Sequence, residues 1–129
     1  EMCGRDWSSD VCSSDLMPVA VREIDATALA AASRDGAVVV DVREPHEYVD
    51  GHVPCARLVP LSTVDRHARD LRRQTHGTGP VYLICRTGVR SADAARMLES
   101  AGVDAVSVAG GTEAWKASGL PVVTGSHAC

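Results

Sequence analysis

A strand, a tight loop and a helix follow one another in residues 80–102, whose sequence is PVYLICRTGVRSADAARMLESAG. The first six residues are mostly apolar and include branched side chains, a pattern typical of a strand buried on both faces. Segment 91–102 places Ala94, Leu98 and Ala101 on one stripe, which predicts a helix that ends near its final glycine. A buried strand joined to a helix by a short loop is the repeating unit of a parallel sheet.

The same alternation of strand and helix patterns continues on both sides of this unit. Residues 37–42, AVVVDV, form a second β-branched run that indicates a buried strand. Asp25 is placed to cap a helix, and Pro45 is placed to begin a short helical turn. Because strands that alternate with helices form parallel sheets, we predict an α/β domain with helices on both faces of a parallel sheet. Strands are expected in 21–25, 37–42, 56–61, 80–85 and 104–111, and helices in 26–34, 45–52, 62–73, 91–102 and 112–119.

The composition of the 129-residue chain is that of a globular domain. Hydrophobic residues make up 45% of the chain and charged residues 23%. The net charge of −4 is not the positive excess that is typical of nucleic-acid-binding domains. No apolar run approaches the roughly 18 residues of a membrane span. We therefore expect a single domain with no nucleic acid partner and no membrane segment.

Residues 1–16, EMCGRDWSSDVCSSDL, differ from the rest of the chain. They lack hydrophobic periodicity, and they have neither the basic start nor the apolar centre of a secretory signal. They resemble the translation of a sequencing-adapter oligonucleotide, so we expect the natural chain to begin at Met17. A disordered native extension is the alternative. The expected organisation is a leader at 1–16, a folded domain at 17–125 and a tail at 126–129.

Three cysteines, Cys55, Cys85 and Cys129, lie outside that leader. An odd number without close pairing does not form a disulfide framework, and no cysteine or histidine pair has the spacing of a zinc site. We therefore expect no disulfide framework, no metal and a reducing, cytoplasmic location.

Cys85 is the candidate nucleophile. Ligands of parallel sheets bind beyond the carboxyl ends of the strands, where a loop enters a helix, and Cys85 occupies that position. Backbone N–H groups of the loop would converge on its sulfur, Arg86 and Arg90 would add positive charge, and such surroundings lower the pKa of a thiol. Gly88 would let the loop curl with a positive φ. The alternative is a buried, inert cysteine, but packing does not require two guanidinium groups.

Three separated motifs give the chain a resemblance to the rhodanese family, the single-domain sulfurtransferases. Residues 85–91, CRTGVRS, are similar to the family's Cys-x-x-Gly-x-Arg active loop. Residues 41–61, DVREPHEYVDGHVPCARLVPL, resemble its N-terminal signature, and residues 110–122, GGTEAWKASGLPV, resemble its C-terminal signature. The resemblance covers essentially all of Met17 to Val123.

The resemblance implies a three-layer fold with five parallel strands and a reaction in two steps. Cys85 would take a sulfane sulfur from a small anionic donor such as thiosulfate, and the persulfide would pass it to cyanide, a thiol or a protein cysteine. No metal or cofactor is implied, and a monomer or weak dimer is expected. The expected substrate-binding residues are Arg86, Thr87, Gly88, Val89, Arg90 and Ser91, and the expected loop-supporting residues are Asp41 and Arg43.

Two other functions are open as alternatives. Cysteine-dependent phosphatases and arsenate reductases place five residues between the cysteine and the arginine, whereas four separate Cys85 from Arg90. The shorter loop favours a cradle for one sulfur over one for a phosphate. A non-catalytic sulfur-carrier or regulatory rhodanese module is the second alternative, and the intact loop favours an enzyme. Arg86 suits a doubly charged donor, although a polysulfide or a small persulfide is also open.

Cys55 departs from the family pattern, which has glycine at this position. A cysteine with positive φ would be strained by roughly 1–2 kcal/mol. We interpret the site instead as a turn with ordinary dihedral angles, and a resolving thiol for Cys85 is a further alternative. His52 is expected to make structural hydrogen bonds in a turn, and Trp115 to pack in the core.

Overall fold

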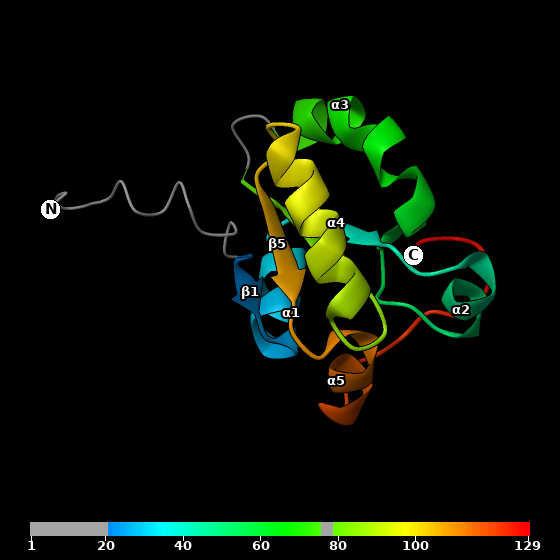
Figure 1. The fold of residues 1–129 in the computed structure, drawn as a ribbon. Helices are drawn as coiled ribbons and strands as arrows, with labels where there is room; N and C mark the ends of the chain where they lie inside the picture. Colours follow the sequence, from blue (N-terminus) through cyan, green and yellow to red (C-terminus); the bar gives the residue numbers. More distant parts are fainter. Residues whose placement is uncertain (1–20, 76–78) are drawn as a thin grey trace, which may run out of the picture.

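The computed structural model describes residues 21–75 and 79–129 (Figure 1). Five strands form one all-parallel sheet in the order β1-β5-β4-β2-β3, which confirms the predicted α/β fold. The strands are β1 (Glu23–Ile24), β2 (Val38–Asp41), β3 (Arg57–Leu58), β4 (Val81–Ile84) and β5 (Ala105–Val108). The helices are α1 (Ala26–Arg34), α2 (Pro45–Asp50), the short 3₁₀ helix η2 (Leu61–Thr63), α3 (Val64–Thr75), α4 (Val89–Ser100) and α5 (Gly111–Ala117).

Helices cover both faces of the sheet (Figure 1). On one face, Leu71 of α3 and Leu98 of α4 pack with Leu83 of β4 in a single buried cluster. On the other face, Leu29 of α1 and Trp115 of α5 pack in a second cluster. Branched aliphatic side chains dominate both clusters, which explains how a chain without phenylalanine fills its core. None of the helices in the described residues is long and apolar enough to cross a membrane.

Local capping signals explain where several helices begin. The carboxylate of Asp25 accepts a hydrogen bond from the N–H of Ala28 at 2.8 Å, and α1 starts immediately after it. Pro45 opens α2 as predicted. The prediction was wrong at α4, which begins at Val89 rather than Ser91. Gly88 has φ +108° and caps the helix from a left-handed conformation, so the helix starts two residues earlier.

The topology places the loop after β4 at the middle of one sheet edge. β4 is the central strand, with β2 and β5 on either side. Since all five strands are parallel, the loops that follow β2, β4 and β5 emerge at the same edge. Cys85, the glycine pair after β5 and the segment leading to α2 therefore lie together.

The C-terminal segment returns beside α2, at the far side of the molecule from β1 (Figure 1). Val123 forms an antiparallel bridge with His52, and each backbone N–H donates to the other residue's carbonyl at 2.8–2.9 Å. The buried His52 ring also bonds the carbonyls of Tyr48 and His127, at 2.8 and 2.9 Å. The prediction of a structural role for His52 is thus confirmed.

The turn expected at Cys55 is present, but the ordinary dihedral angles expected for it were wrong. The φ of Cys55 is +67°, because this residue occupies the third position of a turn in which the N–H of Ala56 donates to Val53 at 3.0 Å. Pro54 stands at the second position, and a turn of this kind requires a positive φ at the third, where glycine is favoured. Cys55 is also disulfide-bonded to Cys129, so the expectation that the chain forms no disulfide was wrong for this pair. The N–H of Cys55 donates to Ala128 at 2.7 Å, which brings the end of the chain to this turn.

Candidate active site

Cys85 is the one free cysteine in the described part of the chain. It follows β4 directly and precedes the loop that leads into α4. Only 1% of its surface is exposed. The resolving-thiol interpretation of Cys55 does not fit this arrangement, because the sulfur of Cys55 is bonded to Cys129.

The loop folds back over the Cys85 sulfur. The N–H of Gly88 donates to Sγ at 3.0 Å, and the positive φ of Gly88 makes that direction possible. The Cys85 thiol also donates to the hydroxyl oxygen of Ser91 at 3.5 Å. That hydroxyl is fixed in turn by the carbonyl of Gly88 at 3.2 Å and the hydroxyl of Ser107 at 2.8 Å.

These contacts set the ionisation of the thiol. Burial raises the pKa of Cys85, because a thiolate is poorly solvated inside the protein. Hydrogen bonds from the Ser91 side chain and from the backbone N–H groups of Ser91, Gly88 and Thr87 lower it by more, and the net pKa lies below its usual value of 9.0. The surroundings therefore stabilise the thiolate of Cys85 relative to that of an ordinary cysteine.

The loop is held from behind by the start of α5. Thr112 donates to the carbonyl of Cys85 from its backbone N–H at 2.8 Å and from its hydroxyl at 3.0 Å. The N–H of Glu113 donates to the carbonyl of Arg86 at 3.1 Å. Gly111 permits this approach, since a Cβ on it would lie 2.4 Å from the Cys85 carbonyl oxygen. The glycine pair after β5 thus positions the backbone that carries the nucleophile.

Arg90 binds Glu47 rather than pointing freely at the sulfur. Two hydrogen bonds of 2.7 and 2.9 Å join the guanidinium to the carboxylate, and both groups are partly buried. The Arg90 hydrogen bonds lower the pKa of Glu47 from 4.5 to about 2, against an opposing effect of burial. Arg90 therefore ties the cysteine loop to α2, and much of its charge is neutralised there.

Asp41 and Arg43, the expected loop-supporting residues, bind each other and the end of α2. The buried Arg43 guanidinium binds the Asp41 carboxylate at 2.8–3.0 Å and donates to the carbonyl of Gly51 at 2.8 Å. These bonds fix the end of α2 rather than reaching the cysteine loop itself. The same helix carries Glu47, whose pair with Arg90 joins α2 to the cysteine loop.

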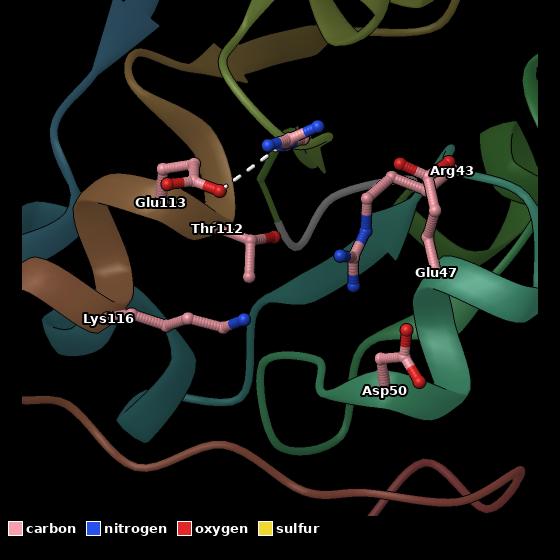
Figure 2. Close-up of a pocket in the computed structure, with 7 residues that line it drawn as sticks. Arg43, Glu47, Asp50, Thr112, Glu113 and Lys116 are labelled. Carbon is pink, nitrogen blue, oxygen red and sulfur yellow. Dashed lines mark hydrogen bonds and ion pairs between the residues drawn. The ribbon is translucent and has the colours of Figure 1, made fainter.

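A hollow of about 210 Å³ lies beside the loop (Figure 2). The side chain of Arg86 is 65% exposed and pairs with Glu113 at 3.2 Å, the contact drawn dashed in Figure 2. Thr87 and Val89 are exposed in the loop, so the backbone N–H of Thr87 is its contribution to the sulfur environment. The hollow is lined by Arg43, Glu47, Asp50, Arg86, Thr112, Glu113 and Lys116.

Sequence reasoning missed the part of this site that comes from α2 and α5. The residues not anticipated as members of the site are Glu47, Asp50, Thr112, Glu113 and Lys116. All five lie in the N-terminal and C-terminal signatures at 41–61 and 110–122. Polar residues in such signatures are candidates for a functional site, so this position could have indicated them. In the described residues no three metal-ligating side chains come together.

Comparison with known proteins identifies the family. Residues 25–118 match the family model of the Rhodanese-like domain, and the chain belongs to the rhodanese family. The uncharacterized protein slr1261 of Synechocystis is 38% identical over 96 residues, which cover 74% of this chain and 51% of that protein. The chain thus spans about half the length of that relative.

Other relatives match over most of their length. The thiosulfate sulfurtransferase GlpE of Pseudomonas putida is 37% identical over 93 residues, which cover 70% of this chain and 80% of GlpE. The crystal structure of a rhodanese-related protein from Thermoplasma volcanium has a TM-score of 0.69 and 33% identity, with 79% of this chain and 97% of that chain covered. Fold and family are therefore shared along the whole region that holds the site.

Proposed function

We propose that the protein is a sulfurtransferase that carries a sulfane sulfur on Cys85 as a persulfide. The donor is thiosulfate or a related small anion, and the acceptor is thiophilic. The observation that carries the proposal is the N–H of Gly88 at 3.0 Å from the Cys85 sulfur, in a loop that lowers the pKa of the thiol. A buried sulfur that accepts N–H hydrogen bonds is prepared for negative charge.

In the first half-reaction the Cys85 thiolate attacks the outer sulfur of thiosulfate. A sulfur–sulfur bond forms on Cys85, the sulfur–sulfur bond of the donor breaks, and sulfite leaves with its electron pair. The loop N–H groups that favour the thiolate also suit the persulfide anion, which occupies the same cradle.

In the second half-reaction the acceptor attacks the outer sulfur of the persulfide. Cyanide leaves as thiocyanate, or a thiolate leaves as a new persulfide, and Cys85 returns as a thiolate. Dividing the transfer into two steps in this way is ordinary nucleophilic catalysis. The similarity to GlpE of Pseudomonas putida, a thiosulfate sulfurtransferase, supports this choice of donor.

Arg86 is the residue that we assign to donor attraction. It follows the nucleophile directly, and its exposed pair with Glu113 is of a kind that contributes little energy. A doubly charged donor can therefore draw the guanidinium to itself. Arg90 is a poorer candidate, because both terminal nitrogens of its guanidinium group donate to the Glu47 carboxylate.

The Arg90 contact also argues against phosphate-ester chemistry. A phosphate-binding loop needs an arginine free for paired hydrogen bonds to the phosphate oxygens. Here that arginine is held by Glu47, and the loop is one residue shorter than the phosphatase loops. We therefore retain sulfur transfer as the proposal.

A screen of donors and acceptors on the purified chain tests the proposal. With thiosulfate and cyanide we expect thiocyanate production that is abolished by Cys85→Ser. Arg86→Ala should raise the KM for thiosulfate and leave a neutral donor much less affected, since it removes an attraction present throughout the reaction. No turnover with any donor would refute the enzyme and leave a non-catalytic module. Equal losses for charged and neutral donors would make Arg86 a loop-shaping residue instead.

A further inference from the structure

Two charged side chains in the hollow beside the cysteine loop have no partner among the described residues. Neither the ammonium group of Lys116 nor the carboxylate of Asp50 makes a hydrogen bond or ion pair in the part of the chain that the structure describes. The other charged groups of the hollow are engaged: Arg43 with Asp41, Glu47 with Arg90, and Arg86 with Glu113. The hollow thus presents one positive and one negative group to whatever enters it.

The two groups come from different sides of the hollow. Asp50 ends α2, and Lys116 lies in the last turn of α5. Figure 2 shows the Lys116 side chain extended across the hollow toward the side that carries Arg43 and Asp50. The Lys116 nitrogen reaches the end of α2, since a Cβ built on Gly51 would lie 3.9 Å from it, at ordinary contact distance. Both side chains are exposed, and each can therefore meet a ligand that enters the hollow from solvent.

We propose that Lys116 and Asp50 select the sulfur acceptor by binding a thiol that carries both a carboxylate and an ammonium group. Free L-cysteine and the γ-glutamyl end of glutathione share this chemistry. The inference rests on the proposed function of Cys85, because the hollow adjoins the loop that would hold the persulfide. The carboxylate of the acceptor pairs with Lys116 and its ammonium group with Asp50.

The transfer step itself is the second half-reaction with this acceptor. The acceptor thiol gives its proton to solvent, and its thiolate attacks the outer sulfur of the Cys85 persulfide. The new sulfur–sulfur bond forms on the acceptor, and the bond to Cys85 breaks with its electron pair remaining on Cys85. The charges at Lys116 and Asp50 are unchanged, so they act on binding and orientation of the acceptor.

Acceptor kinetics with matched variants test the pair. For each thiol, the KM of the variant is divided by the KM of the wild type, so that differences in reactivity between the thiols cancel. Lys116→Met should raise the KM about two- to fivefold for L-cysteine, glutathione and mercaptopropionate, and leave cysteamine and mercaptoethanol unchanged. Asp50→Asn should raise it by a similar factor for L-cysteine, glutathione and cysteamine. If Asp50→Asn raises the KM more for one of L-cysteine and glutathione, that thiol is the better-fitting acceptor.

Control variants on α3 carry the same changes in charge. Arg69→Met and Asp65→Asn alter exposed residues of α3, a helix that does not line the hollow. Both should leave the KM of every thiol unchanged. The proposal is overturned if Lys116→Met affects no thiol, or if it affects neutral and charged thiols alike.

A binding measurement separates this inference from the proposed function. Lys116 is the single lysine of the chain, so lysine-selective isotope labelling gives one lysine side-chain signal in an NMR spectrum. S-methylcysteine and S-methylglutathione cannot accept sulfur, and both should shift that signal in a saturable way that Asp50→Asn weakens. If the wild type fails to load sulfur while the signal shifts, the function is wrong and the binding pair stands. If sulfur loads and the signal does not move, the pair is wrong and the function stands.

Discussion

A methyl group added at Gly111 tests how the nucleophile is positioned. In Gly111→Ala the new Cβ would lie 2.4 Å from the Cys85 carbonyl oxygen and 2.6 Å from the Arg86 carbonyl carbon and oxygen. These are backbone atoms, so the cysteine loop and α5 must move apart by about 1 Å to reach ordinary contact. Overpacking of this kind costs about 1–3 kcal/mol, in addition to roughly 1–2 kcal/mol for an alanine at φ +55°.

Gly119→Ala is the matched control. Gly119 has φ +77°, yet a Cβ there would meet no atom within 4 Å, so it incurs the backbone cost without the displacement. Urea unfolding should place Gly111→Ala about 1–3 kcal/mol below the control. In the thiosulfate:cyanide assay Gly111→Ala should lose about a hundredfold in kcat/KM, since a shift of about 1 Å at the reacting atoms has that effect, while Gly119→Ala should keep its activity. Equal stability and activity for the two variants would refute the reasoning.

Three further changes test other parts of the account. Ser91→Ala should raise the pKa of Cys85, because it removes a hydrogen bond that favours the thiolate. The pH dependence of iodoacetamide alkylation measures this pKa, and an unmoved midpoint would contradict the role of the hydroxyl. Because the pKa of Glu47 is depressed from 4.5 to about 2, its contribution to stability is complete above pH 4.5 and is lost as the pH falls toward 2. Glu47→Gln should therefore flatten the loss of stability in that window, and an unchanged acid limb in pH-dependent unfolding would count against the pair. Cys129→Ser should lower the free energy of unfolding by about 2–4 kcal/mol, because the bond to Cys55 closes a long loop. Reductant should lower the free energy of unfolding of the wild type to the same value. If neither the substitution nor the reductant changes it, the disulfide has no role in stability.

The parts of the fold that sequence could predict are those set by local chemistry. Helix α1 begins after Asp25 because one side chain caps it, and β2 and β4 are buried because their side chains are apolar on both faces. The position of Cys85 followed from topology, since a loop after a buried strand must emerge at the carboxyl edge of a parallel sheet.

Other features depend on segments that are distant in sequence, and no local pattern could predict them. The disulfide between Cys55 and Cys129 forms because the chain after α5 returns along α2, and the His52–Val123 bridge guides that return. The hollow beside the cysteine loop combines α2 with α5, so no local pattern indicated that Lys116 and Asp50 line it together. The engagement of Arg90 by Glu47 likewise follows from packing between α2 and the cysteine loop.

The central claim is that Cys85 carries the sulfur, and intact-mass spectrometry with peptide mapping tests it most directly. After incubation with thiosulfate and removal of excess donor, the protein should gain the mass of one sulfur atom, mapped to the peptide that contains Cys85. Cyanide should then remove it with stoichiometric release of thiocyanate, and Cys85→Ser should fold normally yet gain nothing. Sulfur found on Cys55 or Cys129 alone, or turnover retained by Cys85→Ser, would contradict the account.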